Sequence, residues 1–518
     1  MKSVMSHSFS QVPRAQIERS AFDRSHGYKT TFDAGYLVPI YLDEALPGDT
    51  FNLSLSSFAR LATPITPFMD NLFLDTFFFA VPIRLIWNNW QKFNGEQTDP
   101  GDSTDYLVPT MTSPVGTGHV VGSLSDYFGI PTGVASLTHS SLWHRAYNLI
   151  WNEWFRDQNL QDSVVVDKDD GPDTSTDYVL LRRGKRHDYF TSCLPWPQKG
   201  PAVPLPLGTT APVLSDDTEI NIKYLAAGTN RNIVFAAANN LAYSGGGLAG
   251  NAMFGTNTGL IVDLEDATAA TINSLRQAFQ LQKLYERDAR GGTRYTEIIR
   301  SHFGVVSPDA RLQRPEYLGG GSTPVTINPI AQTSSTDATT PQGNLAAMGI
   351  ASSMGTGFSK SFTEHCVIIG LVSVRADLNY QQGLNRMFSR STRWDFYWPS
   401  LSHIGEQAVL NKEIYAQATS ADDDVFGYQE RYAEYRYKPS VITGQFRSTY
   451  SSSLDIWHLA QEFGSLPTLN STFIQEDPPL DRVIATPAEP HFLFDSYFKL
   501  RCVRPMPTYS VPGLIDHF

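Results

Sequence analysis

The stretch that most constrains the fold runs over residues 72–81, which read LFLDTFFFAV and are apolar except for Asp75 and the threonine after it. Successive side chains of a β-strand point to opposite faces, so Phe77 would lie on one face and Phe78 on the other. A strand that is apolar on both faces must be covered on both faces, which places it inside a packed sheet. Pro82 cannot donate a backbone hydrogen bond, so we expect regular pairing to end there.

Further segments carry the residue patterns of strands, helices and loops. Period-two alternation marks strands, and apolar residues at a spacing of three or four mark helices. The sequence predicts strands at residues 36–41, 50–55, 365–374 and 492–501 and around Val441 and Phe446, helices at 85–90, 124–129, 141–154 and 268–290, and a Ser-, Thr-, Gly- and Pro-rich linker at 322–357.

The helix predicted over residues 268–290 carries an apolar stripe at helical spacing. We expect this stripe to face the interior of the protein; its members are Ile272, Leu275, Phe279 and Leu284. A long middle of loops and helices separates two buried β blocks, 32–83 and 365–503. If both blocks share one sheet system, strands must pair across hundreds of residues, as they do in jelly rolls with long loops.

The composition favours a subunit whose sides are covered by neighbours. Hydrophobic residues make up 41% of the 518 residues, but charged residues only 18%, which is low for a freely soluble monomer. A net charge of −12 argues against a protein whose whole surface binds nucleic acid, while a locally basic face is compatible with it.

The cysteines and the apolar segments indicate the compartment. Cys193, Cys366 and Cys502 lie far apart and have no metal-ligand spacing, so we expect neither a disulfide framework nor a zinc site. The N-terminus has no apolar run of a signal peptide, and the apolar segment 72–87 is too short for a bilayer. We expect a soluble protein that is made in a cytoplasm and does not insert into membranes.

No motif points to catalysis. We find no nucleophile elbow, no zinc-protease motif and no phosphate-binding loop, and residues 422–424 (DDD) read as an exposed acidic loop rather than a cation site. We therefore expect no enzymatic activity, no metal and no cofactor. The sharpest basic run, residues 182–187 (RRGKRH), is interpreted as a solvated turn, with an anion contact as the alternative.

One long stretch resembles a known family. Residues 286–305 (ERDARGGTRYTEIIRSHFGV) and 307–320 (SPDARLQRPEYLGG) are similar to the major capsid protein of the Microviridae, especially its gokushovirus branch. The resemblance continues in family order at 32–35 (FDAG), 46–49 (LPGD), 67–71 (PFMDN), 93–96 (FNGE), 187–190 (HDYF), 194–200 (LPWPQKG) and 477–482 (DPPLDR). It leaves residues 201–266 without a match.

The resemblance implies a mainly-β fold, an eight-stranded antiparallel jelly roll (the viral capsid β-barrel) with long loop and helix insertions. It further implies a homo-oligomeric T=1 shell of sixty copies around circular single-stranded DNA, located in the virion and assembled in the host cytoplasm. In this family an insertion forms protrusions proposed to meet a host receptor. The chain would divide into a basic, internal arm (1–31), a first barrel part with helical insertions (32–200), the surface insertion (201–266) and the remaining barrel with a C-terminal arm (267–518).

Two sets of candidate contact residues follow. An acidic chain can enclose DNA only where its inward surface is locally basic, which predicts contacts from Lys2, Arg14, Arg19, Arg24, Lys499, Arg501, Arg504 and Tyr509. Tyr497 and Phe498 either stack on bases or belong to the core of a terminal strand. The candidates for host attachment are Tyr243, Gly246, Asn251 and Phe254.

Two questions stay open at this stage. The sequence does not decide whether a small basic internal protein takes part in packaging. The competing class is a carbohydrate-binding or carbohydrate-active β-sandwich, since nine Trp and 23 Tyr are enough to line a sugar groove. That class needs paired carboxylates in a cleft.

Overall fold

The computed structural model describes residues 18–204, 213–215, 221–224, 229–236, 240–243, 252–254, 260–262, 272–305, 313–334, 336 and 341–509. Between 213 and 262 the description covers the backbone alone. The chain divides into two compact units: Gln198–Val305, and Met1–Pro197 together with Val306–Phe518.

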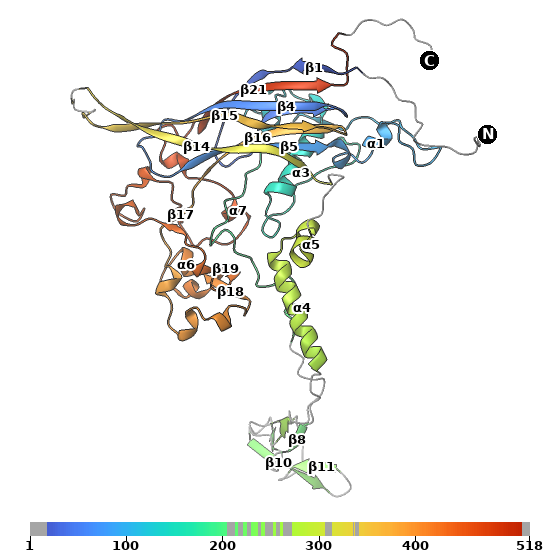
Figure 1. Ribbon diagram of the computed structural model, residues 1–518. Helices are drawn as coiled ribbons and strands as arrows, with labels where there is room; N and C mark the ends of the chain where they lie inside the picture. The colour runs from blue at the N-terminus through green and yellow to red at the C-terminus, as the bar shows by residue number, and fades with distance from the viewer. Residues whose placement is uncertain are drawn as a thin grey trace. The chain divides into compact units, whose positions relative to one another are not determined.

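The larger unit is built on a curled antiparallel sheet of nine strands (Figure 1). Its strands are β1 (Ser20–Asp23), β2 (His26–Phe32), β3 (Val38–Ala45), β4 (Thr50–Leu61), β5 (Leu72–Pro82), β14 (Glu316–Ala331), β15 (Leu345–Ser361), β16 (Cys366–Ala376) and β21 (Phe492–Arg504).

The strand order is that of a jelly roll. β1 and β2 pair with successive parts of β21 and act as one interrupted strand, since the Arg24 N–H between them still donates to the Leu500 carbonyl at 3.0 Å. We count β1 and β2 together as strand 1 and number the other strands 2 to 8 along the chain. One half of the curled sheet then has the order 1-8-3-6 (β2–β21–β4–β15), and the other half, which packs against it, has the order 2-7-4-5 (β3–β16–β5–β14). This order confirms the predicted mainly-β antiparallel jelly roll. The sheet therefore begins within the segment that we expected to be an N-terminal arm, whose residues 1–17 lie outside the described part.

The central strands β5 and β16 are buried on both faces, as the apolar run of β5 predicts. Phe78 packs into the core between the two sheets together with Phe51 and Phe498. Phe79, its neighbour in sequence, packs into a second cluster on the opposite face. Trp87 and the helix α3 (Leu142–Ile150) cover that face.

The segment 322–357 is not a linker, and this prediction was wrong. Most of it forms β14 and β15, which pair antiparallel with each other and insert between β4 and β5. Glycines permit the close approach: a Cβ on Gly320 would overlap the Thr76 carbonyl oxygen, and one on Gly357 would overlap the Leu53 carbonyl oxygen.

The connections carry short helices and small sheets. Helices of this unit are α1 (Trp90–Phe93), α2 (Leu124–Tyr127), α3, α6 (Asn411–Ile414) and α7 (Ser471–Ile474). The small sheets pair β6 (Thr110–Thr112) with β7 (Thr138–Ser140), β17 (Asn379–Tyr380) with β20 (Ser440–Val441), and β18 (Glu406–Leu410) with β19 (Val425–Glu430).

Most of the predicted helices are confirmed, and two short predictions were wrong. The helix predicted at 141–154 is α3, continued by one π-helical turn (Trp151–Phe155). Residues 85–90 are not a single helix, because a 3-10 turn (Ile83–Leu85) and α1 lie on either side of an irregular stretch. Phe446 lies in a 3-10 turn rather than a strand.

The smaller unit combines short strands with two helices. The strands are β8 (Val213–Ser215), β9 (Asn221–Tyr224), β10 (Thr229–Ala236), β11 (Asn240–Tyr243), β12 (Ala252–Phe254) and β13 (Leu260–Val262), and the helices are α4 (Ile272–Arg290) and α5 (Tyr295–Phe303). The six strands give the segment 201–266 regular secondary structure.

The apolar stripe of α4 does not face inward, which corrects our expectation. Ile272, Phe279 and Leu284 are exposed by 72%, 64% and 45%, and only Ala289 of this helix is buried. The helical periodicity predicted the element correctly, but a helix buries its stripe only where a partner lies against it. Among the described residues, no helix is long and apolar enough to cross a membrane.

Candidate nucleic-acid interface

Strand β21 presents its residues alternately to the core and to solvent. Phe498, Leu500 and Cys502 are buried, whereas Lys499 and Arg501 are exposed and Tyr497 is exposed by 53%. Of the two alternatives for the aromatic pair, Phe498 is therefore a core residue and Tyr497 a surface residue. The alternation follows from the two-residue period of a strand whose one face covers a core.

The exposed cations of β21, Lys499 and Arg501, have few carboxylates near them. Hydrogen bonds from Ser25 lower the pKa of Asp23, and the nearby charges of Lys499 and Arg501 lower it further. Within the described residues, no ion pair engages Lys499 or Arg501. The only carboxylate exposed on the same face of β21, that of Asp495, pairs with Lys29 of β2 at 2.8 Å.

The structure also places two residues here that the sequence did not single out. Arg60 and Phe58 of β4 are exposed and lie opposite Leu493 and Asp495 of β21. Phe58 is exposed by 46%. Their alternation with buried residues of β4 was visible in the sequence, but which strand lies beside β21 was not.

The remaining described cations of the predicted set are held by this chain. Arg24 pairs with Asp43 at 2.6 Å. Arg504 donates to the Glu44 carbonyl at 2.7 Å and lies 3.3 Å from the Asp49 carboxylate. Arg19 donates to the Gly48 carbonyl. These contacts join the two ends of the chain to the last residues of β3 and to the turn after it. Three of the predicted phosphate contacts therefore already have acceptors within this chain.

The other predicted residues fall at the margins of the description. Tyr509 is exposed by 82%, and Lys2 and Arg14 lie outside the described residues. Of the attachment candidates, Tyr243 ends β11 and pairs with Ile233 of β10, and Phe254 ends β12. Gly246 and Asn251 lie outside the described residues.

The basic run 182–187 is only in part the solvated turn that we expected: Arg186 and His187 are exposed, but the cations before them make contacts inside the chain. Arg183 and Arg375 both donate to the Asp75 carboxylate, at 2.7 and 2.8 Å. Lys185 donates to the Phe473 carbonyl at 2.7 Å, and burial lowers the pKa of Lys185 to about 8. Asp75, the one charge in the apolar run of β5, is thus matched by two cations from distant segments.

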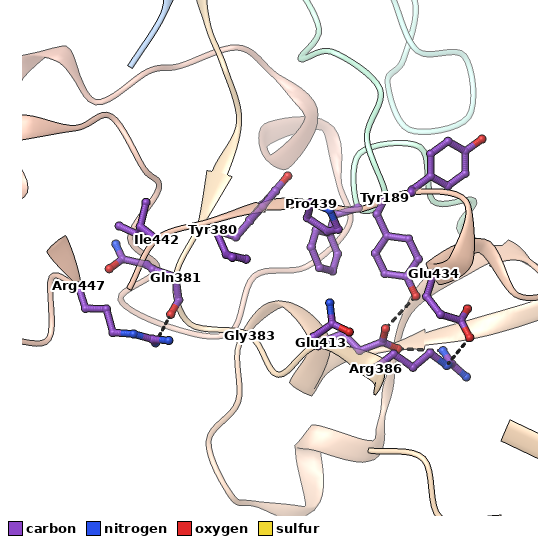
Figure 2. Close-up of a pocket in the computed structure, with 14 residues that line it drawn as sticks. Tyr189, Tyr380, Gln381, Gly383, Arg386, Glu413, Glu434, Pro439, Ile442 and Arg447 are labelled. Atoms are coloured by element: carbon purple, nitrogen blue, oxygen red, sulfur yellow. Dashed lines mark hydrogen bonds and ion pairs between the residues drawn. The ribbon is translucent and has the colours of Figure 1, made fainter. Parts of the chain in front are cut away.

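A recess with about 580 Å³ of empty space, part of it open to solvent, lies among the loops after β17 (Figure 2). Figure 2 shows Arg386 on its floor between Glu413 and Glu434, with the hydroxyl of Tyr189 directed at Glu413. Arg386 Nη1 lies 2.9 Å from Glu413, and the Tyr189 hydroxyl donates to the other Glu413 oxygen at 2.8 Å.

The floor of the recess is electrostatically satisfied. Burial raises the pKa of Glu413, and Arg386 offsets part of that rise. Glu434 accepts from Gln407 at 2.6 Å and lies 3.4 Å from Arg390. Both carboxylates thus have cationic partners and hold the loops together. The outer wall carries exposed residues instead, among them Tyr437, Val441 and Arg447.

Three histidines gather beside α3. His119 and His139 approach to 3.0 Å between their Nε2 atoms, and the ring of His139 stacks on that of His144. Burial lowers the pKa of His144 to about 3. Within the described residues, no group of three or more His, Cys, Asp or Glu side chains has the geometry to hold a metal ion.

Comparison with known proteins covers nearly the whole chain. The family described as "Capsid protein (F protein)" matches residues 10–514. Capsid protein VP1 of Bdellovibrio phage phiMH2K is 52% identical over 99% of this chain and 98% of that protein. Capsid protein VP1 of Chlamydia phage 1 is 47% identical over 99% and 98%, and that of Spiroplasma virus 4 is 39% identical over 98% and 97%.

These matches run through both β blocks of the jelly roll and through the segment between them. Full-length identity of this order is sufficient to assign a family. The chain belongs to the capsid protein (F protein) family and is a structural protein of a virion.

Proposed function

We propose that this chain is the major capsid protein of a T=1 particle, in which sixty copies enclose circular single-stranded DNA. The observation that carries the proposal is the family match over residues 10–514 on a jelly roll with strand orders 1-8-3-6 and 2-7-4-5. The match favours this function over the carbohydrate-binding alternative. We propose assembly in the host cytoplasm.

The exposed apolar surface of the single chain supports assembly. Met354 on β15, Leu107 and Phe303 are exposed by 84%, 83% and 77%. Large exposed apolar groups mark surfaces that associate, and obligate interfaces bury roughly 2,000 Å² or more. A subunit surrounded by copies of itself would cover such side chains.

The genome contact that we propose is electrostatic and independent of sequence. Lys499 and Arg501 lie on one face of β21, and Arg60 of β4 is exposed farther along the same sheet, opposite Leu493. Cations of this kind bind phosphates without reading bases, and Tyr497 offers a ring on which an unpaired base can stack.

Residues 201–266 are proposed to form the surface module for host attachment. In support, the compact unit Gln198–Val305 contains them and is distinct from the barrel. Replacing 201–266 with a short Gly-Ser bridge should leave assembly intact and abolish attachment to host cells. Loss of folded protein in that variant would assign the segment to the core instead.

Electron microscopy of the purified full-length chain, expressed with its phage's other virion proteins, tests the function. We expect closed particles of uniform diameter that protect circular single-stranded DNA from nuclease. Monomers or dimers alone under low-salt conditions would contradict the shell, and closed particles that protect no DNA would contradict genome enclosure.

A further inference from the structure

A second surface of the larger unit carries exposed aromatic rings interleaved with cations. We name residues 386–398 and 431–438 the arginine–aromatic surface. Its exposed large side chains are Met387, Phe388, Trp394, Phe396, Tyr397, Trp398, Tyr435 and Tyr437, exposed by 54%, 70%, 58%, 51%, 50%, 38%, 51% and 45%. Neither the capsid fold nor the β21 interface uses these side chains.

Cation–π contacts order the rings. The Arg393 guanidinium lies 4.4 Å from the centre of the Trp398 ring and 5.5 Å from that of Trp394. Arg390 lies 4.4 Å from the ring centre of Tyr435 and 5.4 Å from that of Phe396. Such contacts are attractive and restrain the rings, each of which stays at least 38% exposed.

The two segments form one continuous patch. The Trp394 carbonyl accepts from Arg431 at 3.2 Å. The rings of Tyr397, Tyr432 and Tyr435 contact one another edge to face.

The patch is cationic in a chain whose net charge is −12. With Arg447, which lines the adjoining recess, seven cations stand against four carboxylates, even when Glu413 and Glu430 are counted. Within the described residues, no ion pair engages Arg393 or Lys438. The Asp395 carboxylate, which lies between the two tryptophans in sequence, instead accepts the backbone N–H groups of Ser391 and Thr392.

The recess of Figure 2 opens beside this patch. Tyr437 and Arg386 belong to both, and Arg447 donates to the Gln381 carbonyl on the recess wall at 2.6 Å.

We propose that the arginine–aromatic surface binds single-stranded DNA. Bases stack on Trp394, Trp398 and Phe396, and phosphates lie against Arg393 and Lys438. The proposal rests on the proposed function, enclosure of a single-stranded genome. Stacking platforms with unneutralised cations suit unpaired strands, because in a duplex the faces of the bases are already stacked on each other.

A second copy of this chain is the competing occupant, because Trp, Tyr and Arg also dominate protein interfaces. The excess positive charge favours single-stranded DNA, since the strand carries a phosphate at every nucleotide. A second copy of this chain would instead need a separately placed carboxylate for each of Arg393 and Lys438.

Binding of fluorescent 20-nucleotide oligothymidine to the full-length protein, followed by anisotropy across a salt series, tests the proposal. The double variant Trp394→Ala/Trp398→Ala should weaken binding at least about tenfold, since each base–aromatic stack contributes about 1–3 kcal/mol. Arg393→Gln should reduce the slope of log K against log salt by about 0.7. A 20-base-pair duplex should bind more weakly than the single strand.

The controls are a half-buried cation and an exposed ring outside the surface. Lys412 pairs with Asp423 at 2.6 Å, and Tyr295 on α5 is exposed by 76%. Lys412→Gln and Tyr295→Ala should retain the affinity and the slope of the parent. Equal binding by the tryptophan variant and the Tyr295→Ala control would overturn the proposal.

Ultraviolet crosslinking of particles separates this inference from the proposed function. Crosslinks from DNA to Trp394 or Trp398 support both. Particles that hold DNA crosslinked only at β21, or whose Trp394 crosslinks to another protein copy, overturn the inference and leave the function standing. Particles that hold no single-stranded DNA overturn the function itself.

Discussion

Two neighbouring pairs of strands in the sheet, β5 with β16 and β14 with β15, are stabilised in different ways. Strands β5 and β16 bury nearly every side chain, with Phe78 on one face and Phe79 on the other. The neighbouring strands β14 and β15 bury few, and join the same sheet through backbone pairing, small residues and glycines. Apolar area stabilises the first pair, whereas geometric fit of the backbone decides the second.

This difference teaches that a jelly roll does not need every strand to carry an apolar pattern. Once β5 and β4 are fixed by their buried faces, their free edges offer a template, and a polar segment of the right length can pair there. The predictions below test that division, from the largest effect to the smallest.

Asp75→Asn should destabilise the protein most, by about 3–5 kcal/mol, because it leaves Arg183 and Arg375 buried beside a neutral group. Chemical denaturation measures the change. Ser322→Ala is the matched control, since Ser322 lies opposite Asp75 on β14 and is exposed. We expect that change to stay within about 0.5 kcal/mol. Equal losses in the two variants would remove the distinction between the strand pairs.

Gly320→Ala should cost about 1–3 kcal/mol although it adds a single methyl group, because the added Cβ would overlap the Thr76 carbonyl oxygen. Gly101→Ala, where no atom lies within 4 Å of the added Cβ, serves as the control. The midpoint of thermal unfolding reports both. An unchanged midpoint for Gly320→Ala would mean that close backbone fit does not decide the pairing of β14 with β5.

Acid should destabilise the protein where α3 packs against β5 and β16. Burial lowers the pKa of His144 on α3 to about 3, while the unfolded chain titrates near 6.5. The unfolded state therefore binds the proton first, and stability present above pH 6.5 declines as the pH falls. Between pH 6.5 and 5 we expect a loss of up to about 2 kcal/mol, at about 1.4 kcal/mol per pH unit.

Urea unfolding at the two pH values measures that loss. His144→Asn should reduce the loss, whereas the exposed His187→Asn should not. An unchanged pH dependence in the His144 variant would show that another group governs the acid response.

Phe279→Ser on α4 should leave the free energy of unfolding within about 0.5 kcal/mol, since the ring is 64% exposed in the single chain. If copies cover it in the shell, the same change should lower particle yield. Lys283→Ser, also exposed on α4, is the control for assembly. Sedimentation separates particles from subunits, and equal yields would place Phe279 outside the contacts between copies.

The sequence alone determined the elements whose side chains repeat with a clear period. The apolar run of β5, the alternation of β4 and β21 and the spacing of α3 are local patterns, because burial on one or two faces must repeat at the period of the element. The family resemblance supplied the jelly roll, and the chain-order match confirms it.

Only the tertiary structure decided which partners meet. The polar segment 322–357 has no apolar period, so nothing local reveals that it completes the sheet at β14 and β15. Arg24 and Arg504 looked free in the sequence, but pairing of the first and last strands brings both to Asp43. Ile272 and Phe279 looked buried, yet a stripe is buried only by a partner. Pairing, neutralisation and cover depend on residues hundreds of positions away, and a local pattern carries no record of them.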